Sequence, residues 1–178
     1  MAGKEWIEMK CKQGKGSLLV SACLLGEKCR YNGGDCASPQ FLASLEGQRV
    51  IPFCPEVLGG LPTPRAPAEI RGGGGEQVWA GQAVVVGKDG RDLTTQYKSG
   101  AERTLALARK HRVQWGIAKE KSPACGCHKI YDGMFRGKLI PGAGVAVSLL
   151  KKNKIKIISE SDWLRRRGEG FFEKTSLV

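Results

Sequence analysis

Three cysteines stand at positions from which they could form one metal site. Cys23, Cys54 and Cys125 each come at or shortly after the end of a short apolar run. Three thiolates could hold a zinc ion, with water or His128 as the fourth ligand. They could equally bind an iron–sulfur cube by three corners, which leaves one iron without a protein ligand. Such an iron is a Lewis acid suited to a soft sulfur atom. The plainest alternative is three small buried residues.

The elements that must position these cysteines alternate along the chain. Short apolar runs predict buried strands at 17–22, 49–53, 113–118 and 154–158, and helices are predicted at 38–46, 97–110, 143–150 and 161–167. The proline-rich segment 59–71 is predicted as an irregular loop, and 82–86 as an edge strand. This order predicts an α/β fold with a mostly parallel sheet flanked by helices, similar to a Rossmann fold. Because parallel strands end at one edge, we expect the three cysteines to meet there.

The remaining cysteines allow several readings. Cys29 and Cys36 share a glycine-rich loop with Cys23, and Cys127 comes two residues after Cys125. Each is a candidate fourth ligand or sulfur-handling thiol. Cys11 lies in an N-terminal extension, residues 1–15, which we expect to be mobile and to which we assign no chemistry.

The length of 178 residues fits one domain, which we place at 16–170. No apolar run approaches the roughly 20 residues that a membrane helix needs. The charged start of the chain does not resemble a signal peptide, so a cytoplasmic protein is expected. Seven cysteines cannot all pair, and the cytosol keeps thiols reduced.

The formal net charge is +12, concentrated in blocks of lysine and arginine. Such blocks are typical of solvated surfaces and helix ends. They also suit an anionic partner, such as a nucleotide phosphate or RNA. Charge alone does not separate these interpretations.

Several motifs, in order, resemble those of the thiouracil desulfidase (desulfurase) family, whose function was long unknown. The resemblance spans about 17–160 and rests on SACLLG (21–26), RYNGG (30–34), PFCPEVLGGLPTPR (52–65), KEKSPACG (119–126), KIYDG (129–133) and GAGV (142–145). It implies a [4Fe–4S] cluster bound by Cys23, Cys54 and Cys125. Family members replace the thiocarbonyl sulfur of a thiolated pyrimidine with oxygen, without net redox change. Their substrates include 2-thiouracil and 4-thiouridine derivatives.

The resemblance also implies helper residues. Glu56 matches an acidic group, which as a general base would deprotonate the attacking water. Ser122 matches a hydroxyl that could bind the substrate or relay a proton. Residues expected to contact the substrate are Arg30, Tyr31 and Asn32 at the pyrimidine, with Arg65 and Lys121 at a phosphate. The same residues could instead be a surface ion pair, a turn cap and solvated cations.

Two other functions remain open. One is tRNA thiolation by cluster-carried sulfur, although the chain contains no P-loop. The other is a non-catalytic protein that binds zinc or RNA. The extra cysteines and the high charge leave the substrate less defined than the cluster, and the substrate could be a base, nucleoside or nucleotide.

Overall fold

The computed structural model describes residues 16–168, and the N-terminal extension 1–15 lies outside them. Four parallel strands form the central sheet in the order β2-β1-β5-β8: β1 Ser17–Ser21, β2 Arg49–Phe53, β5 Trp115–Ala118 and β8 Lys156–Ser159. The expected mixed α/β fold with a parallel sheet is therefore confirmed. Ser21 pairs with Phe53, and Ala118 with Ser159, so neighbouring strands finish level at the carboxyl edge.

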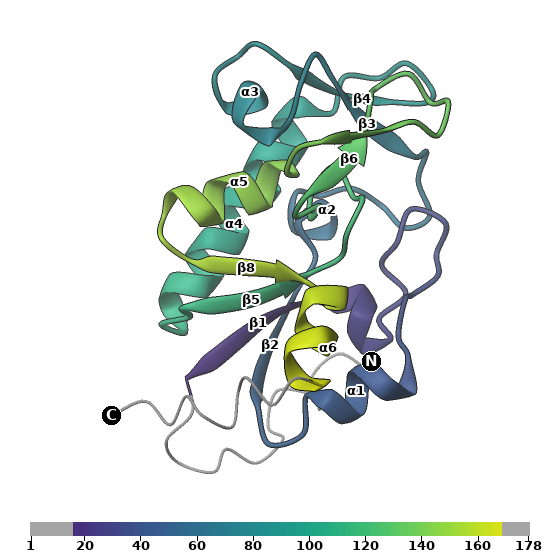
Figure 1. Cartoon of the computed structure of the whole chain (residues 1–178). Helices are drawn as coiled ribbons and strands as arrows, with labels where there is room; N and C mark the ends of the chain where they lie inside the picture. Colours follow the sequence, from purple (N-terminus) through teal and green to yellow (C-terminus); the bar gives the residue numbers. More distant parts are fainter. Residues whose placement is uncertain (1–15, 169–178) are drawn as a thin grey trace.

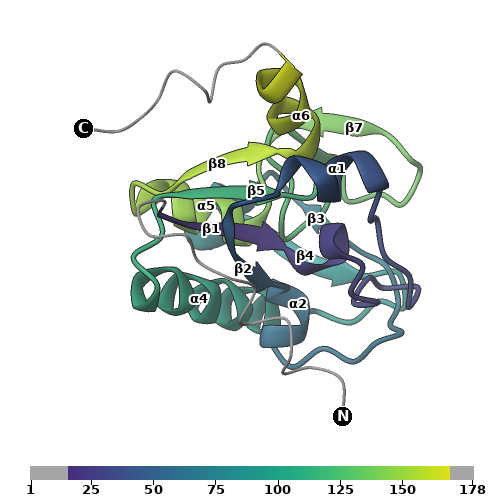
Figure 2. The ribbon, with the colours of Figure 1, turned by 90° about the horizontal axis from the view of Figure 1, so that it is seen from below.

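Helices cover both faces of this sheet. Helices α4 (Thr94–Lys110) and α5 (Val145–Lys152) lie on one side, and α1 (Pro39–Ser44) and α6 (Glu160–Gly168) lie on the other (Figures 1 and 2). Alternate residues of β1 serve the two layers, because successive strand side chains point to opposite faces. Leu19 belongs to the core under α4 and α5, whereas Leu18 and Val20 belong to the core under α1 and α6. Burial on both faces explains why these strands are continuous apolar runs.

Local capping explains where two helices begin. Ser38 caps α1 as expected, since its hydroxyl accepts the N–H of Phe41 at 3.2 Å and proline follows it. Helix α4 starts three residues before the predicted Tyr97, because the Asp92 carboxylate accepts the N–H of Thr94 at 2.8 Å.

The largest departure from expectation lies outside the central sheet. The segment predicted as irregular loop ends in a strand, β3 (Ala68–Arg71), which pairs antiparallel with β4 (Val84–Gly87). Helix α3 (Gly75–Trp79) connects the two, and a second ribbon consists of β6 (Lys129–Tyr131) and β7 (Leu139–Pro141). Figure 1 shows α3, β3, β4 and β6 together on one side of the sheet. The prolines of this segment favoured the prediction of a loop. They all lie before β3, however, so the backbone N–H groups of β3 can still form the hydrogen bonds of the ribbon.

A short helix, α2 (Pro55–Leu58), follows β2 directly and packs closely against α4. An added Cβ at Gly100 of α4 would lie 1.8 Å from the carbonyl oxygen of Pro55. One at Gly59 would lie 2.2 Å from the carbonyl oxygen of Gln96. The two backbones touch because both residues are glycine. Across residues 16–168, the helices are too short or too polar to traverse a lipid bilayer.

Candidate iron–sulfur site

The three cysteines at the strand ends line one cavity. Cys23 lies in the 3₁₀ turn η2 (Ala22–Leu25) after β1, Cys54 is the N-cap of α2 after β2, and Cys125 lies in the loop after β5. The cavity has a volume of about 430 Å³ and borders all three residues. The topology therefore brings together residues that are far apart in sequence, at the carboxyl edge of the sheet.

Cys29 adds a fourth thiol to this cavity. It is 9% exposed, and its thiol interacts with those of Cys23 and Cys54. The contact with Cys23, together with burial, raises the pKa of Cys29 to about 12 against an opposing effect of Cys54. The contact with Cys29 and burial likewise raise the pKa of Cys54. The Cys54 thiol also approaches the Cys29 carbonyl at 3.9 Å. Without a bound metal ion, the raised pKa values favour the protonated thiols of Cys29 and Cys54.

Cys125 is held in a tightly defined loop. Burial raises its pKa, and the Ser21 hydroxyl partly opposes this by hydrogen bonding to its sulfur. The Ser122 hydroxyl accepts the N–H groups of Ala124 and Cys125, both at 3.1 Å. Ser122 is thus a turn cap that also lines the cavity, and its own proton remains available to donate.

The GAGV motif (142–145) supports this loop. The first N–H groups of α5 donate to carbonyl oxygens of the loop. The N–H of Val145 binds the Pro123 carbonyl at 2.9 Å, and the N–H of Ala146 binds the Ala124 carbonyl at 3.0 Å. An added Cβ at Gly144 would lie 2.4 Å from the carbonyl carbon of Ala124. Glycine at this position lets the helix start against the backbone that carries Cys125.

Glu120 closes the same loop through one carboxylate oxygen. Its Oε1 accepts the N–H groups of Lys121, Cys127, His128 and Lys129 at 3.0–3.2 Å. Burial opposes ionisation of Glu120, but these donors outweigh it and hold the pKa of the carboxyl below its usual range. The carboxylate therefore ties the two ends of the loop together.

Glu56, in the first turn of α2, is paired with a buried arginine. Arg65 Nε lies 2.7 Å and Nη2 2.5 Å from Glu56 Oε2, and the arginine side chain is 4% exposed. The same guanidinium donates to the carbonyl of Cys29 at 2.9 Å. Its Nη1 binds Pro62 O and Thr63 Oγ1. Burial and the nearby Glu56 carboxylate raise the pKa of Tyr97, whose hydroxyl also interacts with that carboxylate.

Most residues expected to contact a substrate border this cavity. Arg30, Tyr31, Arg65 and Lys121 line it, and the Arg30 guanidinium stacks on the Tyr31 ring at 5.7 Å. Asn32 is not among the lining residues. Its Oδ1 accepts the N–H of Gly34 at 3.1 Å, which stabilises the loop after Cys29.

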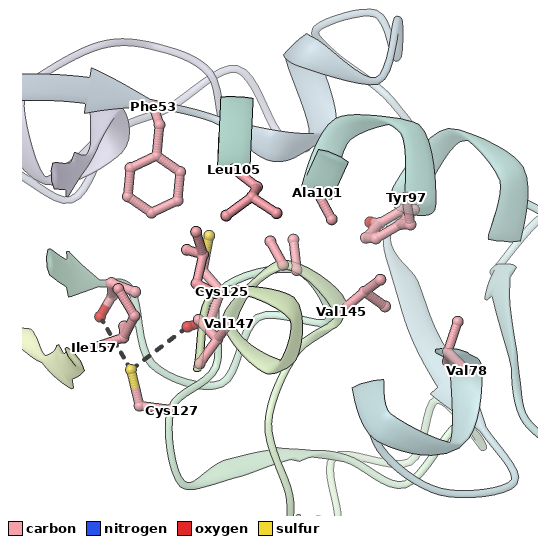
Figure 3. Packing of buried hydrophobic residues seen from close by; sticks show 14 of the residues in the cluster. Phe53, Val78, Tyr97, Ala101, Leu105, Cys125, Cys127, Val145, Val147 and Ile157 are labelled. Atoms are coloured by element: carbon pink, nitrogen blue, oxygen red, sulfur yellow. Dashed lines mark hydrogen bonds between the residues drawn. The ribbon is translucent and has the colours of Figure 1, made fainter. Parts of the chain in front are cut away.

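The other extra cysteines occupy different positions. Cys127 is 3% exposed, and its sulfur interacts with the carbonyls of Ala118 and Cys125 (Figure 3). In the same view the Cys125 sulfur lies beside Phe53, at the end of β2, whereas Cys127 lies farther from that ring, near Ile157. Cys36 donates its N–H to the Cys23 carbonyl at 2.7 Å but does not line the cavity. Cys11 lies outside the described residues.

The donor set fits a cluster better than a single ion. Among the residues that the structure describes, no three His, Cys, Asp or Glu side chains are placed to hold one metal ion. A zinc ion needs its sulfurs about 2.3 Å from one centre, whereas a cube binds each sulfur to a different iron. Thiols are soft ligands that suit iron–sulfur clusters.

Comparison with known proteins agrees with this geometry. The family model described as 2-thiouracil desulfurase matches residues 18–162. The chain belongs to the 2-thiouracil desulfurase family. The match includes the cysteines at all three strand ends, Glu56, and the loop that carries Ser122.

Two members of this family show how close the similarity is. The uncharacterized protein YbbK of Bacillus subtilis (strain 168) is 46% identical over 145 residues, which cover 82% of this chain and 96% of YbbK. A solved structure described as the [4Fe-4S]-dependent thiouracil desulfidase TudS is 39% identical, with a TM-score of 0.75. That match covers 89% of this chain and 99% of TudS.

Sequence reasoning missed part of the cavity of this desulfurase-family protein. Glu69 comes from β3, and Tyr131 and Phe135 come from β6 and the turn after it. Each belongs to a segment for which no strand was predicted. Their apolar periodicity is too short to reveal a strand, so only the paired ribbons show that they reach the site.

Proposed function

We propose that this protein replaces the thiocarbonyl sulfur of a thiolated pyrimidine with oxygen and releases sulfide, without net redox change. One observation carries the proposal: Cys23, Cys54 and Cys125 line a single cavity together with Glu56 and Ser122. The family and the similarity to TudS support this assignment. Thiolated bases, nucleosides and nucleotides, including 2-thiouracil and 4-thiouridine derivatives, are the substrate class.

Cys23, Cys54 and Cys125 would hold a [4Fe–4S] cluster. When bound, this cluster supplies an iron without a protein ligand, a Lewis acid that attracts the thiocarbonyl sulfur and needs no external electrons. The protein excludes most solvent from the ligands, since Cys23 and Cys125 are 8% and 6% exposed.

Glu56 acts as the general base. It accepts a proton from water while the water oxygen bonds to the ring carbon. The carbon–sulfur bond then breaks, and the sulfur leaves as hydrogen sulfide after taking up protons. The ring carbon exchanges a doubly bonded sulfur for a doubly bonded oxygen, so its oxidation state is unchanged. Arg65 fixes the Glu56 carboxylate through Nε and Nη2, and we assign it this role rather than contact with a phosphate.

Ser122 donates its hydroxyl proton to the substrate or relays it. Its lone pairs are occupied by two backbone N–H groups, so donation is the function left to it. Arg30, Tyr31 and Lys121 line the cavity, and the two cations have no carboxylate partner within residues 16–168. They suit an anionic substituent such as a phosphate, while Asn32 shapes the loop behind Tyr31.

We place the protein in the cytoplasm. The six cysteines of the described part are all free, as expected for thiols in a reducing compartment. Oxidising compartments favour disulfides between thiols as close as these.

The test is anaerobic cluster reconstitution followed by sulfide measurement with 2-thiouracil and 4-thiouridine monophosphate. The wild type should take up iron, become brown and release sulfide. Glu56→Ala should keep the visible spectrum but lose turnover by about 100-fold or more, whereas Cys54→Ala should lose the cluster. Glu102→Gln, on the exposed side of α4, is the matched control. A colourless protein that binds zinc and releases no sulfide contradicts the proposal, and turnover restricted to thiolated tRNA would change the substrate class.

A further inference from the structure

A second carboxylate borders the cavity in an unusual setting. Glu69 lies in the middle of β3, opposite Val86 of β4, and is 8% exposed. It lines the same cavity as the three cysteines. Buried carboxylates are normally paired with a cation or fully hydrogen-bonded, because burial of a charge is costly. Glu69 has no ion pair in the part of the chain that the structure describes.

Within residues 16–168, the Glu69 side chain makes its one hydrogen bond to a backbone group. Its Oε2 accepts the N–H of Phe135 at 3.0 Å. Phe135 adopts a left-handed conformation, with φ of 54°, in the turn between β6 and β7, and it also borders the cavity. This bond leaves the second oxygen, Oε1, without a protein donor among residues 16–168. This oxygen keeps some solvent access, and the Glu69 residue lines the cavity.

The contrast with Glu56 defines what Glu69 can do. Both carboxylates line the cavity, but Glu56 is paired with Arg65 whereas Glu69 forms no ion pair among residues 16–168. A carboxylate oxygen with free lone pairs in a confined cavity can accept a hydrogen bond from a bound molecule. The chain has a net charge of +12, yet no lysine or arginine of the described part forms a salt bridge with this carboxylate.

We infer that Glu69 is a specificity-determining residue that accepts the ring N–H next to the thiocarbonyl carbon. This inference rests on the proposed function. Both 2-thiouracil and 4-thiouridine present an N–H at N3, directly beside the carbon that loses sulfur. A carboxylate acceptor selects rings with this N–H, because a ring without it would leave the buried charge unpaired. Glu69 contacts the substrate through a hydrogen bond only and takes no proton in the reaction.

The test combines one variant with two substrates. In Glu69→Gln the amide oxygen can still accept the Phe135 N–H, so the amide NH₂ replaces the acceptor that faces the substrate. The probes are 1-methyl-2-thiouracil, which keeps one ring N–H at N3, and 1,3-dimethyl-2-thiouracil, which has none. Glu76→Gln, on the exposed side of α3, is the matched control.

For the wild type and Glu76→Gln, kcat/KM should be at least about 10-fold higher with the monomethyl compound. In Glu69→Gln the value for that compound should fall by about 10- to 100-fold, mainly through KM, while the dimethyl value stays unchanged. Iron content and the visible spectrum should match the wild type. A steric preference alone would leave the selectivity of Glu69→Gln intact.

Two results overturn the inference. One is a wild type with equal kcat/KM values for both compounds. This result does not depend on whether a variant folds. The other is a Glu69→Gln variant, with full iron content, that keeps wild-type selectivity. A wild type that releases sulfide from no thiolated pyrimidine instead refutes the proposed function, so the two failures are distinguishable.

Discussion

Gly100→Ala tests whether backbone contact between α4 and α2 positions the second cysteine. The added Cβ would lie 1.8 Å from Pro55 O and 2.8 Å from the Pro55 carbonyl carbon. Both contacts are to backbone, so no side-chain rotation relieves them. Helix α2 carries Glu56 and has Cys54 as its N-cap. Any displacement of α2 therefore moves a ligand and the general base together.

The magnitude follows from two opposing effects. Cβ atoms essentially never come within 3.0 Å of another heavy atom in this type of contact. The backbone of α2 must therefore move by about 1 Å, and overpacking of this kind costs about 1–3 kcal/mol. Alanine in a helix interior recovers about 1 kcal/mol relative to glycine. Because the 1.8 Å contact is severe, we take the upper part of that cost, about 2–3 kcal/mol. The expected net loss is then about 1–2 kcal/mol, which lowers the Tm by about 2–8 °C.

The assay has two readouts. Thermal unfolding of the cluster-free protein should show the lower Tm, and anaerobic reconstitution should yield less iron per chain, since sites tolerate only about 0.5 Å of displacement. The control is Glu102→Ala, at an exposed position in the same helix. If Gly100→Ala matched this control in Tm and iron content, close packing of α2 on α4 would not be what positions Cys54.

Two further substitutions address the ties around the cysteines. Arg65→Lys keeps a cation beside Glu56, but the lysine cannot also bind the carbonyls of Cys29 and Pro62. Urea unfolding of the cluster-free protein should therefore show that its free energy of unfolding falls by about 2–3 kcal/mol. The control Arg103→Lys weakens one exposed hydrogen bond and should lose under about 0.5 kcal/mol, and equal losses in the two variants would contradict the argument. Glu120→Gln should lose about 1–2 kcal/mol at neutral pH. Because the pKa of Glu120 is lowered in the folded state, its stabilisation is present above the unfolded value of about 4.3 and is lost as pH falls through the folded pKa. The unfolding free energies of the wild type and Glu120→Gln should therefore converge as the pH falls below the unfolded pKa, and a gap that stayed constant would argue against this role.

The central sheet was predictable because its strands are buried on both faces. Each strand is a short apolar run, and β1, β2 and β5 each end close to a cysteine. Parallel pairing then dictates that their ends share an edge. Convergence of Cys23, Cys54 and Cys125 on one cavity follows from this topology and needs no detail of side-chain packing.

The edge strand predicted at 82–86 corresponds to β4, but the pairing within the ribbons was not predictable from local pattern. Strand β3 covers only four residues and follows three prolines, and its partner β4 lies thirteen residues further along the chain. Nothing within either segment indicates the other, because the pairing depends on the turn and on α3 between them. Glu69 could therefore be read from the sequence as a residue, but not as part of the cavity.

The pairing of Glu56 with Arg65 shows a different limit. Both residues belong to one motif, in which Glu56 was expected to deprotonate the attacking water and Arg65 to contact a phosphate. The sequence contains no signal that the guanidinium turns inward to the carboxylate and to the carbonyl of Cys29. Burial determines this orientation of Arg65, because a guanidinium that is 4% exposed needs hydrogen-bond acceptors from the protein itself.

These ties divide the cavity into two parts of different origin. The ends of β1, β2 and β5 supply the thiols, whereas Glu69 and Phe135 come from the ribbons. Arg65, at the end of the motif 52–65, connects it to the motif RYNGG (30–34), because its backbone N–H binds Tyr31 O at 2.8 Å. Its side chain binds Glu56 and the carbonyl of Cys29. Substitutions in the ribbons should therefore change which pyrimidine is accepted while leaving iron content intact. Substitutions at the strand ends should remove the cluster first, and selectivity only as a consequence.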